Sequence, residues 1–168
     1  MKTLYLALGL AAALHAQNTV RWSATTGDVV LSAAATAATI QQPATNGNQA
    51  YIDQVIVYCS VACNVTLAAN GTAATATAGT IQPLLPNQLN AVIPQTFWTA
   101  SNVGTGTAQS GITHVPAGAT VTLCFSPLCG ASGQVILGIG AGTAQNFTVS
   151  IASITGTANI TFLGRSVI

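Results

Sequence analysis

Apolar and polar residues alternate along most of this chain, and this period of two constrains its fold more than any other feature. In residues 147–151 (FTVSI), every second side chain is large and apolar, and each residue between them carries a hydroxyl group. Successive side chains of a β-strand point to opposite faces, so this run suits a sheet with one dry and one wet face. Five further runs predict strands at residues 54–58, 64–67, 120–123, 134–137 and 159–163.

Two alanine-rich stretches, residues 31–39 and 68–78, are the places where a helix competes with this pattern. Alanine is the strongest helix former, but threonines interrupt both stretches and neither carries large apolar side chains at a spacing of 3.6 residues. We therefore expect strand or loop in both. Three prolines punctuate residues 81–103, which we expect to be mostly one long loop.

Turn signals separate the predicted strands. Asn46-Gly47 and Asn70-Gly71 supply the left-handed conformations of tight turns, and residues 116–118 (PAG) precede a predicted strand. The pattern as a whole predicts an all-β protein, specifically a single antiparallel β-sandwich domain.

The first 16 residues have the layout of a secretory signal peptide. Lys2 is followed by an apolar run over residues 4–14, and Ala16 precedes a polar residue. The alternative is a buried N-terminal helix. If the segment is a signal, we expect a secreted protein that is extracellular or at the cell surface, with an N-terminal strand or extension over residues 17–49 and the sandwich domain over 50–168.

Charged residues are almost absent. They make up 3% of the chain, against about 25% in ordinary soluble domains. Beyond residue 16 only four remain, Arg21, Asp28, Asp53 and Arg165, so the side-chain charge of that part is zero. This composition argues against a nucleic-acid partner, a coiled coil and a charged disordered tail, and it removes the repulsion that keeps copies of a protein apart.

Residues 50–165 resemble a known group of proteins in their pattern of strands. Residues 133–138 (GQVILG), 147–151 (FTVSI) and 156–162 (GTANITF), preceded by 115–123 (VPAGATVTL), resemble the strands of small jelly-roll-like β-sandwich proteins. Such domains occur among viral structural proteins and uncharacterised extracellular bacterial proteins. The resemblance implies a jelly-roll-like fold and a tendency to assemble, and it assigns no functional residue.

Four cysteines form two close pairs in sequence, Cys59 with Cys63 and Cys124 with Cys129. An even number of cysteines in an exported chain indicates disulfides, and each pair lies between two predicted strands. The local pairing is the easier to form, whereas links between the two pairs would close a longer loop. A four-thiolate zinc site and free thiols are the remaining alternatives.

Residues for acid–base chemistry are scarce. His114, Asp28 and Asp53 are the only histidine and carboxylate side chains beyond residue 16, and no G-x-S-x-G motif is present. We therefore predict a protein that is not an enzyme and uses no cofactor or metal.

Two further features bear on ligands. Asn64, Asn70, Asn146 and Asn159 each begin an N-x-Thr glycosylation sequence. Phe97-Trp98, in the expected long loop, forms an aromatic pair that is able to stack on a sugar ring, unless it folds back as a lid on the sandwich.

The function predicted from these features is that of a non-catalytic extracellular structural protein. We expect it to associate with copies of itself through β-edges, as a subunit of a filament, surface layer or matrix, with residues 17–40 available to complete a neighbour's sheet. The alternative is a secreted carbohydrate-binding or adhesion module, with glycans as partners. Neither hypothesis requires a transmembrane anchor in the mature chain.

Overall fold

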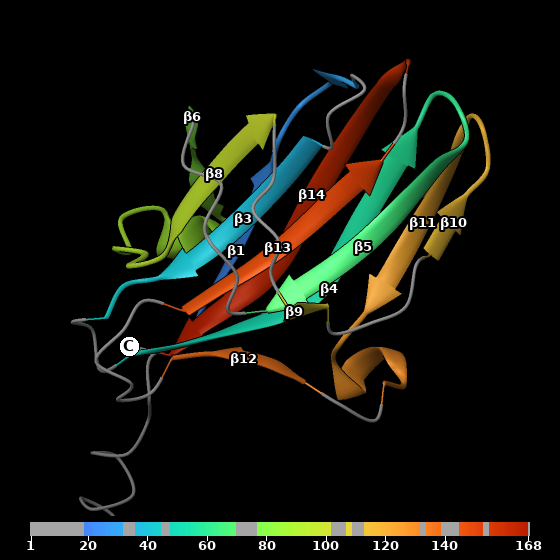
Figure 1. Ribbon diagram of the computed structural model, residues 1–168. Helices are drawn as coiled ribbons and strands as arrows, with labels where there is room; N and C mark the ends of the chain where they lie inside the picture. Colours follow the sequence, from blue (N-terminus) through green and yellow to red (C-terminus); the bar gives the residue numbers. More distant parts are fainter. Residues whose placement is uncertain are drawn as a thin grey trace, which may run out of the picture.

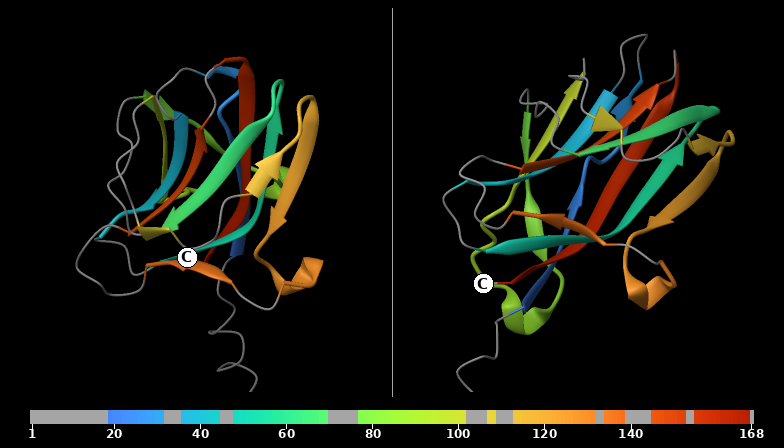
Figure 2. Two further views of the ribbon diagram at one scale, coloured as in Figure 1. Left: turned by 45° about the vertical axis from the view of Figure 1, so that its right-hand side comes forward. Right: turned by 60° about the horizontal axis from the view of Figure 1, so that its bottom comes forward.

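The computed structural model describes residues 19–31, 36–44, 48–69, 77–101, 107–108, 113–131, 134–138, 145–152 and 155–167. The predicted signal segment, residues 1–16, and the Asn46-Gly47 and Asn70-Gly71 turns lie outside these residues. Two antiparallel sheets pack face to face (Figures 1 and 2), so the all-β sandwich is confirmed.

Sheet A has the strand order β11-β4-β14-β1-β7, with β12 also paired to β4 and β2 to β14. Its strands are β1 (Thr19–Thr25), β2 (Val29–Val30), β4 (Gln49–Cys59), β7 (Ile81–Pro83), β11 (Ala119–Cys124), β12 (Val135–Leu137) and β14 (Thr157–Val167).

Sheet B has the strand order β10-β5-β13-β3-β8-β6, with β9 also paired to β5. Its strands are β3 (Thr36–Gln42), β5 (Cys63–Ala69), β6 (Thr77–Gly79), β8 (Thr96–Ser101), β9 (Thr107–Ala108), β10 (Thr113–Val115) and β13 (Gln145–Ala152). Two short 3-10 helices, η1 (Pro86–Gln88) and η2 (Pro127–Cys129), complete the described elements.

Eight of the strands follow jelly-roll topology. Sheet A contains the order β1-β14-β4-β11, and sheet B contains β3-β13-β5-β10. Numbered one to eight along the chain, these strands have the orders 1-8-3-6 and 2-7-4-5, the arrangement of a jelly roll. Strands β6, β7 and β8 extend the two sheets on the side of β1 and β3.

Five of the six predicted runs lie within strands, and the sixth, residues 134–137, begins one residue before β12. Residues 54–58 belong to β4, 64–67 to β5 and 120–123 to β11, and the other three belong to β12, β13 and β14. Burial alternates along β14 from Thr157 to Val167 as the period of two requires. Gly118, the last residue of the predicted 116–118 turn, has φ of +70° and directly precedes β11.

The described residues between 19 and 49 do not form a separate extension. Strand β1 is paired on both sides, to β14 and β7, and β3 is paired on both sides, to β13 and β8. The sandwich therefore begins before residue 50. In this fold the backbone groups of β1 and β3 are already hydrogen-bonded to neighbouring strands of the same molecule.

Residues 81–103 were expected to be mostly a loop, and this prediction is wrong for two parts of the segment. Residues 81–83 form β7, and residues 96–101 form β8, a full member of sheet B. The alternation in Thr96-Phe97-Trp98-Thr99 is the strand signal that the prolines obscured.

All four phenylalanines of the chain join the two sheets in one line of edge-to-face contacts. The ring of Phe97 in sheet B lies 6.0 Å from Phe162 in sheet A, which lies 6.4 Å from Phe147 in sheet B. Phe147 in turn lies 5.6 Å from Phe125, the residue after β11. Aromatic pairs in this geometry stabilise a core beyond the burial of their surface.

The outward face of sheet B is dry at its centre, which the alternation pattern did not predict. Thr39 and Thr148 point away from the shared core, yet they are 0% and 2% exposed. Their hydroxyl oxygens lie 2.9 Å apart and form a cross-strand hydrogen bond. Threonine on alternate positions therefore does not by itself indicate a wet face.

Candidate functional site

A β-bulge at Asp53 brings a carboxylate to the outer face of sheet A. In the register of β4 against β14, Leu163 pairs with Gln54 and Gly164 pairs with Ile52, so Asp53 is the extra residue. Its carbonyl oxygen accepts a hydrogen bond of 2.9 Å from the backbone N–H of Phe125. Because of the bulge, both Asp53 and Gln54 lie outside the core, although Ile52 before them and Val55 after them are buried in it.

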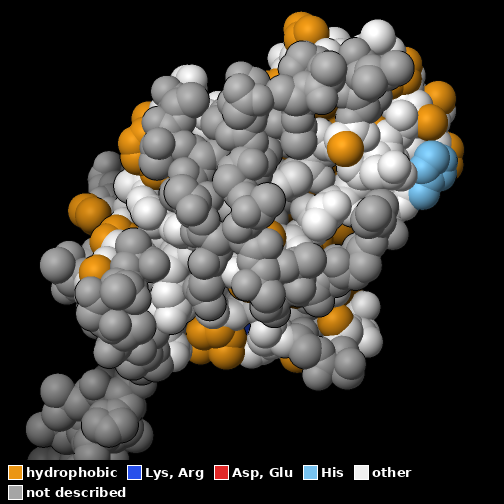
Figure 3. All heavy atoms as spheres, in the orientation of Figure 1, with side chains coloured by type: hydrophobic (Ala, Val, Ile, Leu, Met, Phe, Trp, Pro, Cys, Tyr) orange, Lys and Arg blue, Asp and Glu red, His pale blue; other side chains and the backbone are white. Residues whose placement is uncertain are grey.

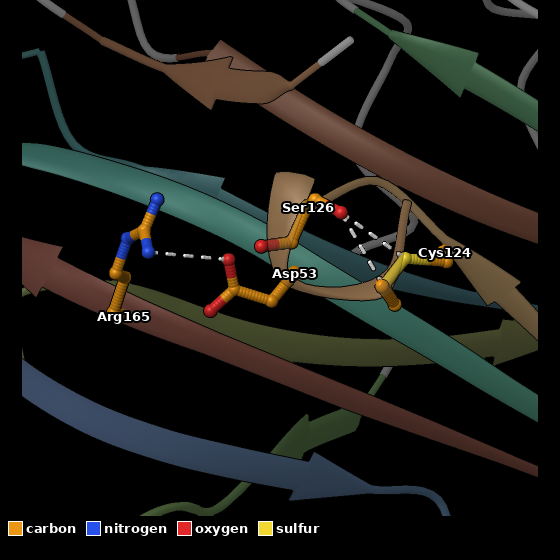
Figure 4. A network of polar contacts seen from close by, with 5 residues as sticks. Asp53, Cys124, Ser126 and Arg165 are labelled. Atoms are coloured by element: carbon orange, nitrogen blue, oxygen red, sulfur yellow. Dashed lines mark hydrogen bonds and ion pairs between the residues drawn. A yellow bond between two sulfur atoms is a disulfide. The ribbon is translucent and has the colours of Figure 1, made fainter. Parts of the chain in front are cut away.

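Arg165 of β14 pairs with this carboxylate (Figure 4). One guanidinium nitrogen lies 3.7 Å from Asp53 Oδ1, and the guanidinium carbon lies 4.7 Å from the centre of the Tyr51 ring. The two charged side chains are 21% and 20% exposed. Arg165 is thus held on both sides, by a charge and by an aromatic face.

Arg21 is the neighbour of Arg165 across β1 and β14. The two arginines occupy directly opposite positions, an arrangement that is unfavourable for like charges. Asp53 faces Arg165, and within the described part of the chain no carboxylate forms an ion pair with the exposed guanidinium of Arg21. The cluster of Arg21, Asp53 and Arg165, called the basic cluster below, therefore carries a net charge of +1.

A small pocket of about 180 Å³ adjoins the basic cluster. Arg21, Leu84 and Leu163 line one part of it, and Ser126 and Cys129 of the η2 turn line another. Both sulfur atoms of the Cys124–Cys129 disulfide lie 3.4 Å from the Ser126 carbonyl oxygen (Figure 4). The disulfide thus closes the turn that forms one wall of this pocket.

Asp28 lies at the other end of the same sheet. It is exposed in the turn between β1 and β2, and Asn159 Nδ2 donates a long hydrogen bond of 3.5 Å to its carboxylate. Figures 1 and 2 show β2 in blue at one end of the sandwich, and η1 and η2 towards the end where the chain terminates. The number of charged residues is evident from the sequence, but the separation of Asp28 from the basic cluster depends on the fold.

A larger cleft of about 550 Å³ lies along the side formed by β6, β7 and β8. Trp98 lines it and is partly exposed, and its indole N–H donates a hydrogen bond of 3.0 Å to Thr96 Oγ1. Phe97 also borders the cleft, but only 2% of it is exposed and its ring belongs to the core. Phe97 is therefore not an exposed stacking residue as predicted, because neighbouring residues of a strand face opposite ways.

An exposed apolar segment borders both hollows. Six large hydrophobic side chains are exposed among the described residues, and residues 84–92 carry four of them: Leu84 (48%), Leu85 (40%), Leu89 (68%) and Val92 (80%). Gln88 ties this segment to β1, since its side chain accepts from the Arg21 N–H at 3.1 Å and donates to the Thr19 carbonyl at 2.7 Å. The sequence analysis missed this surface, although four large apolar residues in a proline-rich connection were its signal.

Figure 3 shows the side of the molecule on which sheet B lies. Among the residues drawn in colour, hydrophobic side chains form separate groups along the margins of this view, and the colours of Lys, Arg, Asp and Glu are almost absent.

A chain of buried hydrogen bonds crosses the core beside the larger cleft. The Trp22 indole N–H donates to Ser166 Oγ at 2.9 Å, and Ser166 Oγ donates to Gln95 Oε1. Gln95 Nε2 then donates to Gln42 Oε1, and all four side chains are at most 4% exposed. An indole N–H can only donate a hydrogen bond, so Trp22 fixes the donor-to-acceptor direction of this series of hydrogen bonds.

Both cysteine pairs form the local disulfides. Cys59 bonds to Cys63 and Cys124 bonds to Cys129, with Cα atoms 6.3 and 6.2 Å apart. The crossed pairing, the zinc site and the free thiols are therefore wrong for this fold, because every thiolate that a metal would need is part of a disulfide. Within the described ranges, no three His, Cys, Asp or Glu side chains gather closely enough to hold a metal ion.

His114 and the glycosylation sequences are distributed over several strands. His114 lies on β10, and its Nδ1 is 3.1 Å from the side-chain oxygen of Asn64 on β5. Asn64 is exposed and Asn159 is partly exposed, but Asn146 is 7% exposed inside sheet B. A glycan on Asn146 is incompatible with this packing, and Asn70 lies outside the described residues.

Compared with known proteins, the chain matches no family model, no curated protein and no solved structure. Along the described parts of the chain, no helix has the length and apolar character needed to cross a membrane.

Proposed function

We propose that this protein is a non-catalytic, secreted structural subunit that associates with copies of itself outside the cell. The observation that carries the proposal is the apolar segment of residues 84–92, in which four large side chains are 40–80% exposed. Gathered apolar surface of this kind marks interaction sites in soluble proteins. With a side-chain charge of zero beyond residue 16, repulsion between copies is weak.

Two other observations support this function. Both disulfides suit an oxidising extracellular compartment. Jelly-roll topology is also the fold implied by the resemblance to viral structural proteins and uncharacterised extracellular bacterial proteins. We infer a contact other than donation of residues 17–40 to a neighbour's sheet, because β1 and β3 are already paired on both sides in this fold. The apolar segment therefore replaces strand donation as the proposed contact.

The test is the concentration dependence of assembly, measured by sedimentation velocity and negative-stain electron microscopy on the oxidised protein. We expect the Leu89→Ser/Val92→Ser variant to need at least tenfold more protein to assemble, because burial of each apolar side chain contributes about 2 kcal/mol. Both residues are more than two-thirds exposed, so the fold of the monomer is preserved.

Ile136→Ser is the matched control, since Ile136 is 47% exposed on β12, outside residues 84–92. It should leave assembly unchanged. An unsubstituted protein that stays monomeric up to about 1 mM in low salt would contradict self-association, because contacts in assemblies are typically much tighter than millimolar.

A carbohydrate-binding module is the second candidate, favoured by the cleft of about 550 Å³ and its partly exposed Trp98. Ligand pockets have volumes of this order, and an indole ring provides an apolar face for a sugar. The expected result is glycan binding on an array that is lost in Trp98→Ala. An array without any Trp98-dependent binding would contradict it.

A further inference from the structure

The four charged side chains of the described residues divide into one ion pair and two separate charges. Arg165 and Asp53 form the ion pair. Arg21 and Asp28 are both exposed, and neither forms a salt bridge with another described residue. In a chain with so few charges, the positions of these two have a large effect on how copies approach one another.

Arg21 and Asp28 cannot neutralise each other within one molecule. Arg21 lies opposite Arg165 on β14, whereas Asp28 contacts Asn159 near the start of that strand. Six residues of β-strand separate these two points on β14, a distance of about 20 Å. This exceeds the Debye length of about 8 Å at physiological salt. One end of sheet A is therefore positive and the other is negative.

Each charged end also carries exposed apolar surface. Val30, two residues after Asp28, is 77% exposed. Beside Arg21, Leu84 and Leu85 are 48% and 40% exposed, and the small pocket of about 180 Å³ lies between Leu84, Leu163 and the η2 turn. The negative end thus has a charge beside a protruding apolar side chain, and the positive end has a charge beside an apolar hollow.

We propose that copies of this protein associate head to tail, with Asp28 and Val30 of one copy docking on Arg21 and the adjoining pocket of the next. This contact rests on the proposed self-association and specifies its polarity. It joins two different surfaces of the same molecule, so it repeats without limit and produces a filament unless the rotation between copies closes a ring.

The experiment uses two charge variants, each alone and then mixed in equal amounts. In Asp28→Arg both ends are positive, and in Arg21→Asp both ends are negative. We expect each variant alone to need at least about tenfold more protein to assemble than the unsubstituted protein. The equimolar mixture should assemble like the unsubstituted protein, because every contact in an alternating filament again joins opposite charges.

Thr122→Arg is the control for added charge, since Thr122 is exposed on β11 and, through its partner Ile56, is level with Thr161 between the two ends of β14. Circular dichroism establishes that each variant is folded. If both variants assemble alone as well as the unsubstituted protein, or if mixing restores nothing, the head-to-tail contact is overturned while self-association through residues 84–92 still stands. If the unsubstituted protein does not assemble, the proposed function falls, and this contact falls with it.

Discussion

At the scale of single residues, Trp22 shows how one side chain connects distant parts of the sequence. It is fully buried, and its indole N–H begins the hydrogen-bond chain through Ser166, 144 residues away, to Gln95 and Gln42. Its ring also lies against Gly164, where an added Cβ would come within 2.5 Å of the indole. Nothing in the sequence around Trp22 indicates which of these groups it contacts.

Replacement of Trp22 by phenylalanine tests the importance of this chain. Trp22→Phe removes the indole N–H that donates to Ser166 and leaves buried polar atoms poorly satisfied. We therefore expect a loss of about 2 kcal/mol or more in the free energy of unfolding. The measurement is urea unfolding followed by circular dichroism. Trp98→Phe is the control, because Trp98 is partly exposed and its indole N–H donates to Thr96 on its own strand. Equal losses in both variants would contradict a special role for the buried chain.

At the scale of elements, local pattern and long-range contacts made different contributions. Residues 54–58 and 159–163 were predictable as strands because side-chain alternation is a property of the strand itself. The role of residues 36–42 was not predictable, since alanine and threonine fit a sheet interior and an extended arm equally well. The bulge at Asp53 also depends on the register with β14, which no local pattern records.

The two disulfides allow a test at this scale. They close loops of similar length, so the chain-entropy model gives each a stabilisation of about 2 kcal/mol. Cys59 and Cys63 are at most 2% exposed, whereas Cys129 is exposed. We expect the Cys59→Ala/Cys63→Ala variant to lose more stability than the Cys124→Ala/Cys129→Ala variant, because it also removes packed atoms from the core.

Urea unfolding of the two double variants measures this difference. Mild reductant followed by mass analysis of alkylated thiols provides an independent check, since the accessible bridge, Cys124–Cys129, should be reduced first. Equal stability losses together with equal rates of reduction would show that burial does not distinguish the two bridges.

At the scale of the whole molecule, association is the property that its surface most favours. The charged ends of sheet A and the apolar segment of residues 84–92 respond differently to salt, because salt screens exposed charges but does not weaken apolar burial. Association should therefore contain one component that depends on ionic strength and one that does not.

Ionic strength separates the two components. In about 0.01 M salt, where the Debye length is about 30 Å, we expect Asp28→Arg to assemble far less readily than the unsubstituted protein. In about 1 M salt, where that length is about 3 Å, both should assemble at the same concentration. Sedimentation velocity at the two salt concentrations measures this. A defect of equal size at both would show that Asp28 acts through the local structure of its turn and not through its charge.

The sequence by itself determined the class of the fold, the positions of most strands and the scarcity of charge, because these follow from composition and from the two-residue repeat. Tertiary structure decided that β1 and β3 are interior strands, that Phe97 joins the core while Trp98 lines a cleft, and that Arg165 and Asp53 pair while Arg21 and Asp28 remain apart. The physical reason is the same in each case. Strand register brings together residues that lie more than 50 positions apart in the chain, and no local repeat carries information over that distance.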